Sequence, residues 1–143
     1  MVEQYKLGRT FLGRLEHGAD LLNELYQVCE SQNIQVGTLQ VIGAIQKACV
    51  GFYDQGKKLY QQIPLPNPAE IVCCIGNISS KDEKVFIHAH LTLSDEEGKA
   101  WGGHLMPGTI IFAAEFQVQE LQGKILQRSE DPVTGLTLWS RGS

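Results

Sequence analysis

The sequence predicts an α+β fold, in which a mixed, largely antiparallel β-sheet with flanking helices forms a single domain. Two features of the chain support this fold class. One segment near the N-terminus carries apolar residues at helical spacing, and most of the chain after it consists of short β-rich runs separated by turn residues. The connections between these runs are too short for crossover helices, so neighbouring strands are expected to pair antiparallel.

The predicted helix covers residues 18–32. Leu21, Leu25 and Cys29 recur at helical spacing and mark one apolar face, while the opposite face is polar. The candidate strands that follow are Gln35 to Ala44, Ala48 to Asp54, Lys58 to Ile63, Ala69 to Ser79, Lys84 to Leu93, Thr109 to Gln119 and a weaker Leu136 to Trp139. The alternate prolines at 64, 66 and 68 predict a loop or an edge strand, because proline cannot donate to a sheet ladder.

The length of 143 residues fits one domain with its own core, and residues 1–143 are assigned to it, with 122–143 forming a C-terminal strand or tail. The composition, 43% hydrophobic and 20% charged, is ordinary for a globular protein and excludes disordered or fibrous classes. Four cysteines without CxxC spacing are expected to be reduced, buried thiols.

The charge and hydropathy of the chain exclude several partners. A net charge of −4 argues against direct DNA binding, because neutralising phosphates requires clustered Lys and Arg. The one basic pair, Lys57 and Lys58, is expected to lie in a solvated hairpin turn. No apolar stretch approaches the ~20 residues of a membrane span, and the first ten residues lack a signal-peptide core, so a cytoplasmic protein without a membrane partner is expected.

Three of the four histidines cluster in His88-Ala89-His90 and Gly102-Gly103-His104. In a strand over Lys84 to Leu93, alternation sends Ile87, Ala89 and Leu91 to the core and both histidines to the other face. The polar run after this strand predicts a turn that returns His104 alongside, and the two glycines permit close backbone approach. The residues therefore predict a metal site at His88, His90 and His104.

Three imidazoles would leave an open position for water or a substrate, as in catalytic zinc sites. Zinc is favoured over iron, nickel or manganese. The alternative interpretation is that the histidines are merely solvated or hydrogen-bonded. Glu115, a carboxylate in an apolar run, is the candidate for a ring-orienting acceptor or a general base, and its alternative is a structural carboxylate at a strand end or a subunit contact.

Nearly the whole chain, from about Tyr5 to Leu121, carries motifs that occur together in one known family. They are Gly8-Arg9-Thr10-Phe11, Gly18-Ala19-Asp20, Val41-Ile42-Gly43-Ala44, Gly51-Phe52-Tyr53-Asp54, Glu70-Ile71-Val72, Gly76-Asn77-Ile78, His88-Ala89-His90-Leu91, Gly102-Gly103-His104-Leu105 and Glu115. This set resembles the plants and prokaryotes conserved domain, or PPC domain. The two histidine motifs are its most specific part.

The resemblance implies an antiparallel-rich sheet with helical cover and assembly into a homotrimer. It also implies a metal protein of the prokaryotic single-domain type, whose three histidines correspond to His88, His90 and His104. In plants the domain follows AT-hook segments, and the family carries a DNA-binding label. This chain has no Arg-Gly-Arg-Pro core of an AT-hook.

Two classes of function follow from these observations. The first is a homotrimeric metal-binding protein with an open three-histidine site that acts on a small molecule. The second is a non-catalytic interaction or DNA-associated regulatory module in which the metal serves structure. The first predicts an open, concave site, and the second predicts a closed one.

Overall fold

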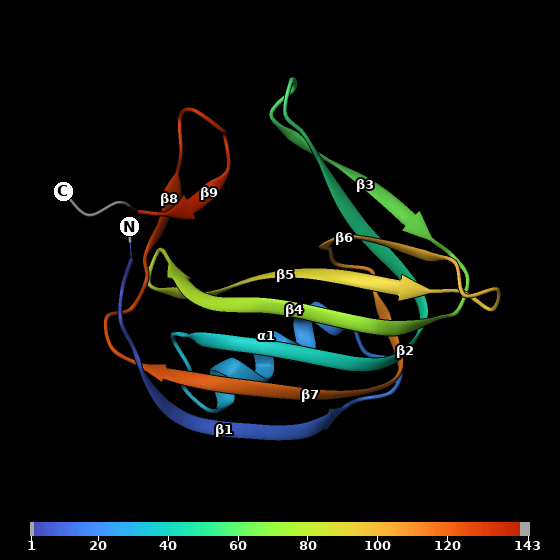
Figure 1. The fold of residues 1–143 in the computed structure, drawn as a ribbon, viewed down its shortest axis with the longest axis horizontal. Helices are drawn as coiled ribbons and strands as arrows, with labels where there is room; N and C mark the ends of the chain where they lie inside the picture. The colour runs from blue at the N-terminus through green and yellow to red at the C-terminus, as the bar shows by residue number, and fades with distance from the viewer. Residues whose placement is uncertain (1, 141–143) are drawn as a thin grey trace.

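The computed structural model describes residues 2–140, and strands dominate it (Figure 1). The elements in chain order are β1 (Lys6–Leu15), α1 (Leu21–Ser31), β2 (Gly37–Asp54), β3 (Leu59–Leu65), β4 (Ala69–Lys81), β5 (Lys84–Ser94), β6 (Ala100–Leu105), β7 (Ile110–Gln122), β8 (Arg128–Glu130) and β9 (Thr137–Trp139). The prediction of a largely antiparallel sheet is confirmed. The prediction of several flanking helices is wrong, because α1 is the single helix of the described part.

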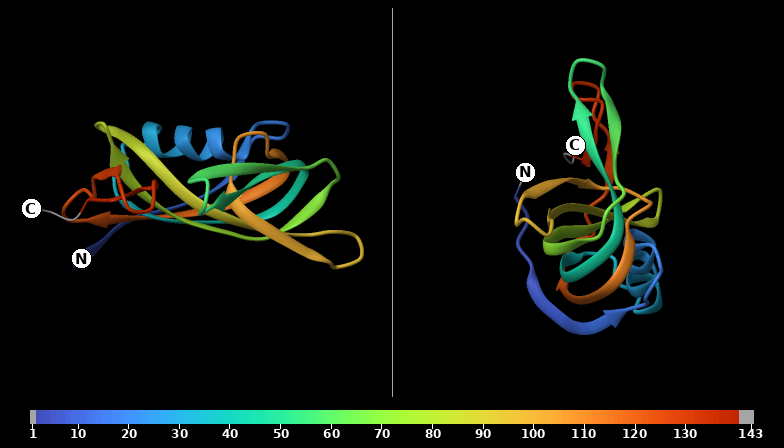
Figure 2. Two further views of the ribbon diagram at one scale, coloured as in Figure 1. Left: turned by 90° about the horizontal axis from the view of Figure 1, so that it is seen from above. Right: turned by 90° about the vertical axis from the view of Figure 1, so that its right-hand side faces the viewer.

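The main sheet has seven strands in the order β1-β7-β2-β4-β5-β6, with β3 paired to β2. Every ladder in it is antiparallel. β6 also returns to β2, where Val50 and Gly51 oppose Leu105 and His104. The sheet therefore curls and closes upon its longest strand, and α1 lies against one face of it (Figure 2).

Helix α1 begins where the side chain of Asp20 accepts a hydrogen bond from the backbone N–H of Asn23, a standard N-cap contact. Leu21, Leu25 and Cys29 of its apolar face are all fully buried against the sheet. The predicted amphipathic helix is therefore confirmed, and its burial gives the domain one continuous core.

Strand β2 runs without a break through residues that the sequence divides into two strands. Its ladders shift register near Gly43 and Ile45, so β-bulges absorb the irregularity and bend the strand. Gly43 has φ +142°, and a Cβ there would lie 2.2 Å from the carbonyl oxygen of Ala113. Glycine is therefore required at this bend.

Two hairpins rise from the sheet, one formed by β2 and β3 and the other by β8 and β9 (Figure 1). Pro64 lies in β3, which pairs only with β2, so the predicted proline-bearing edge strand is confirmed. The C-terminal segment folds back as the small β8–β9 sheet rather than joining the main sheet. Residues 141–143 of the predicted C-terminal strand or tail lie outside the described residues.

All four cysteines are free, as expected, but only Cys29 and Cys74 are buried, whereas Cys49 and Cys73 are partly exposed. Burial raises the pKa of Cys29 and of Cys74 to about 12, so both thiols stay protonated and unreactive. Among residues 2–140, no helix has the length and apolar character needed to cross a membrane.

Candidate metal centre

Strand β5 presents two histidines on one face, as alternation requires. Ile87, Ala89 and Leu91 are buried in the core, whereas His88 is half-buried and His90 exposed on the opposite side. The sheet face that α1 does not cover therefore carries both imidazoles. This confirms the predicted placement of the pair.

His104 reaches the same place from the neighbouring strand β6. It stands directly opposite His90 in the β5–β6 ladder. Gly102 and Gly103 are strand residues rather than turn residues. A Cβ at Gly102 would lie 2.5 Å from the carbonyl oxygen of Leu91, and one at Gly103 would lie 2.8 Å from that of Gly51. The two glycines thus let β6 fit closely between β5 and β2, which sets the position of His104.

The three imidazoles form one cluster. The Nε2 atoms of His88 and His90 are 3.2 Å apart, and one nitrogen from each of the three rings lies within 4.8 Å of the others. Two nitrogens bound at about 2.0–2.1 Å to one tetrahedral ion would be separated by about 3.3–3.4 Å. The His88–His90 pair, at 3.2 Å, is close to this separation, and a modest inward movement of His104 would complete the set.

Two of the three imidazoles, those of His88 and His104, are shifted toward the neutral form. Burial, followed by the neighbouring charges of His88, His90 and Arg128, lowers the pKa of His104 to about 4. Burial, Arg128 and His90 likewise lower the pKa of His88. Nδ1 of His104 is buried and has no hydrogen-bond partner among the described residues. Lowered imidazole pKa values at His88 and His104, together with a buried ring nitrogen that has no partner, suit a divalent transition metal, so these residues fit such an ion.

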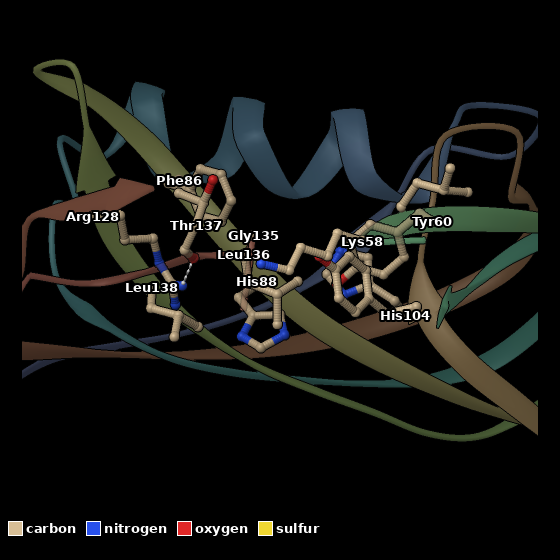
Figure 3. A pocket seen from close by; sticks show the side chains of 12 residues that line it. Lys58, Tyr60, Phe86, His88, His104, Arg128, Gly135, Leu136, Thr137 and Leu138 are labelled. Carbon is tan, nitrogen blue, oxygen red and sulfur yellow. Dashed lines mark hydrogen bonds between the residues drawn. The ribbon is translucent and has the colours of Figure 1, made fainter. Parts of the chain in front are cut away.

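The surroundings of the cluster include a cavity of about 270 Å³. His88 and His104 line one side of it, and the ring of Tyr60 packs on that of His104 at 4.8 Å between centroids. Lys58 and Arg128 also line the cavity (Figure 3). The histidines therefore border an open space that can receive a small ligand.

Sequence reasoning did not identify Lys58 or Arg128 as residues that line the cavity. The prediction that Lys58 lies in a solvated hairpin turn is confirmed, and in addition its side chain lines the cavity and its ammonium donates to the carbonyl oxygen of Pro132 at 3.2 Å. Arg128 reaches the cavity from β8, which belongs to a segment without a clear sequence signal. A lone basic residue in a C-terminal segment gives no sign of such a contact.

Glu115 does not join the cluster within the chain. It is exposed on β7, opposite Ile42 of β2 and Arg14 of β1, whereas His104 opposes Gly51 of β2. At about 3.3 Å per residue, Ile42 and Gly51 are separated by about 30 Å along the strand. Glu115 is therefore not placed to orient the rings or to act as a base beside them in the same chain.

This fold and site define a β-rich single-helix domain with a candidate transition-metal centre at the edge of a small cavity. The model of the Plants and Prokaryotes Conserved (PCC) domain, also abbreviated PPC, matches residues 2–122. The chain belongs to this family, so the resemblance seen in the sequence is confirmed.

Solved structures of similar proteins share the whole fold. The metal-containing protein AF0104 from Archaeoglobus fulgidus is 38% identical with a TM-score of 0.93, over 99% of each chain. A plant- and prokaryote-conserved protein from Pyrococcus horikoshii is 37% identical with a TM-score of 0.93, over 100% of this chain and 99% of that one. A protein from Bacteroides thetaiotaomicron, provisionally described as DNA-binding, is 26% identical with a TM-score of 0.86, over 96% and 98% of the two chains.

A curated relative is a much longer protein. The bifunctional protein GlmU of Synechococcus sp. (strain JA-2-3B'a(2-13)) is 34% identical over 125 residues, which are 85% of this chain and 18% of that protein. The chain thus spans less than a fifth of the length of this relative.

Proposed function

We propose that the chain binds one divalent transition metal, preferably zinc, through His88, His90 and His104, and that it acts in the cytoplasm on a small molecule held in the adjoining cavity. The observation that supports this most directly is the cluster of three imidazoles, in which the Nε2 atoms of His88 and His90 are 3.2 Å apart. The description of AF0104 as metal-containing agrees with the proposal.

When bound, such an ion supplies Lewis-acid polarisation of an oxygen atom on a ligand. The chain's own residues position the histidines and shape the cavity. The strands β5 and β6 fix the backbone of the histidines, and the ring of Tyr60 limits the movement of His104. The half-buried walls reduce competition from solvent, and the open side of the cavity admits a ligand.

The assembly proposed for the protein is a homotrimer. Large apolar side chains are exposed on the sheet face that α1 leaves open, with Leu12 at 77% and Ile42 and Ile75 each at 57% exposure. Ile75 stands opposite His90 in the β4–β5 ladder, so this apolar surface borders the metal centre. Association of chains through it would cover the apolar residues and enclose the exposed side of the site.

The metal proposal is tested by elemental analysis of the purified protein and of two matched variants. We expect about one metal ion per chain in the parent protein and in His17→Gln, which alters the histidine remote from the cluster. We expect the metal to be lost in His104→Gln. An absence of metal from the parent protein after zinc has been offered would overturn the three-histidine site.

A second candidate function is a non-catalytic interaction module, and the exposed apolar surface favours it. In that case, replacing the histidines would leave partner binding intact as long as the fold persists. Measurement of the molar mass in solution for the parent protein and for Ile42→Glu tests the role of the surface. A trimer that dissociates on introduction of the charge supports self-association, and a monomeric parent protein contradicts it. A direct DNA-associated role is disfavoured by the net charge of −4.

A further inference from the structure

The cavity beside the histidines has a charge opposite to that of the molecule. The protein carries 16 acidic and 12 basic residues. Yet the cavity is lined by the cations Lys58 and Arg128 and by no Asp or Glu of the described chain. An acidic protein that gathers only positive charge around one small cavity has a local preference for anions.

Arg128 gives the stronger evidence that the cavity prefers anions, because it is a buried cation without an acidic partner. It is 8% exposed, and among residues 2–140 it forms no ion pair. Its Nε donates to Ser79 Oγ at 2.7 Å, and its two terminal nitrogens donate to Thr137 O and Asn77 Oδ1, each at 2.8 Å. These three bonds leave two of the five guanidinium N–H donors unused.

The aromatic rings around Arg128 only partly replace a counter-ion. The guanidinium lies 4.9 Å from the ring centre of Phe86 and 5.5 Å from that of Trp139. Such contacts stabilise a cation but leave its net charge in place. Arginine is rarely buried unless it is paired, so the uncompensated charge facing the cavity indicates a negative group that the chain itself does not provide.

Lys58 adds a second cation from the opposite hairpin. Its φ of +52° is unusual for a lysine and places it at the turn between β2 and β3. Figure 3 shows its side chain extending from that side toward His88 and Arg128. The tip of the β8–β9 hairpin packs against it, since a Cβ at Gly135 would lie 3.2 Å from Lys58 Cβ and 2.8 Å from the Tyr53 hydroxyl.

Hydrogen bonds join the β2–β3 hairpin to the β8–β9 hairpin beside the cavity. Tyr53 donates its hydroxyl hydrogen to Thr134 O at 2.6 Å, beside the bond from Lys58 to Pro132 O. The two cations are thereby held on either side of the same space. The volume of about 270 Å³ lies at the lower limit of ligand pockets, which suits a small metabolite rather than a nucleotide or a peptide.

We propose that this cavity binds a small organic carboxylate, with Arg128 and Lys58 holding the carboxylate group and with the apolar side chains of Leu59, Phe86 and Leu138 contacting its body. A carboxylate accepts two hydrogen bonds in the geometry that a guanidinium offers, and the apolar lining favours it over a bare inorganic anion. The inference deepens the proposed function and rests on it for the position of the ligand beside the metal.

Calorimetric titration of the full chain tests this inference, with benzoate as the probe and the neutral isostere benzamide as the control. The titrations use both EDTA-treated and zinc-loaded protein. We expect benzoate to bind and benzamide to bind at least tenfold more weakly, because loss of a charge-assisted hydrogen bond has an effect of this size. Lys58→Gln should weaken benzoate binding at least tenfold.

Lys57→Gln is the matched variant, since the adjacent ammonium faces Asp54 at 3.7 Å rather than the cavity. It should leave benzoate binding unchanged. Arg128→Gln should also weaken binding, but it removes contacts that hold the C-terminal hairpin, so the Lys58 variant is the decisive one.

Several outcomes would overturn the inference. They are absence of benzoate binding at millimolar concentrations, equal binding of benzamide, an equal effect of Lys57→Gln, or tighter binding of inorganic phosphate than of benzoate. The two proposals fail separately. Zinc uptake without benzoate binding removes only the carboxylate site, and benzoate binding to a protein that takes up no zinc removes only the metal centre.

Discussion

The two faces of the main sheet differ in composition and in role: one stabilises the fold and the other carries the binding site. The face under α1 is apolar and closed, because Leu25 and Cys29 of the helix pack on it and are fully buried. The open face carries polar residues, the histidine cluster and the exposed apolar surface that includes Ile42. Stability is therefore concentrated on the closed face, while binding chemistry is concentrated at one end of the open face. The predictions below test this division.

Truncation of a side chain on the closed face should have the largest effect. Leu25→Ala removes a fully buried side chain, so we expect a loss of about 2–5 kcal/mol in the free energy of unfolding. Ile42→Ala on the open face should change it by less than about 1 kcal/mol for the single chain. Chemical denaturation measures both. Equal losses in the dissociated single chain would show that Ile42 packs within that chain, and the division into two faces would not hold.

A methyl group at Gly103 should affect the site as well as the fold. Its Cβ would lie 2.8 Å from the carbonyl oxygen of Gly51, so β6 would have to move away from β2. We expect Gly103→Ala to lower the free energy of unfolding by about 1–3 kcal/mol and to weaken metal binding by displacing His104. Thermal unfolding and metal titration measure the two effects. Unchanged metal affinity would show that this strand contact does not position the ring.

Acid should destabilise the metal-free protein through His104. The unfolded chain takes up a proton on this imidazole near pH 6.5, whereas the folded chain does so only near pH 4. The unfolded state thus binds more protons between these values, and the free energy of unfolding should fall as the pH is lowered from 6.5 to 4. Denaturation of EDTA-treated protein across this range should show a smaller slope for His104→Gln. The same slope in both proteins would contradict the lowered pKa.

The smallest effect on the free energy of unfolding is expected for a substitution far from both the core and the metal centre. Arg9 forms an ion pair with Glu120 at 2.7 Å, and its side chain is 52% exposed. Arg9→Gln should lower the free energy of unfolding only slightly, because the pair is exposed to solvent, and added salt should reduce the difference further. A larger loss that persists in high salt would indicate that this end of the sheet is covered by a partner.

The histidine cluster and the core-facing residues could be predicted from the sequence because both depend on local periodicity. Alternation along one strand decides where His88 and His90 point, and helical spacing decides which side of α1 is buried. The short turn before His104 made its return to the neighbouring strand predictable as well.

The cationic wall could not be predicted, because it depends on contacts between distant residues. Arg128 meets Ser79 from 49 positions away, and Lys58 meets Pro132 from 74 positions away. The continuity of β2 was missed for a related reason. Bulges accommodate its polar interruption at Gln46 and Lys47, and sequence alternation does not reveal a bulge.

The pairing of β1 has a consequence for the synthesis of the protein. This strand is hydrogen-bonded only to β7, with Lys6 opposite Gln122. At about 5–20 residues per second, a ribosome needs about 5–20 seconds to produce the partner after the first strand has been made. Until then β1 has no strand to pair with, so the edge of the sheet that it forms can be completed only after most of the domain has been translated.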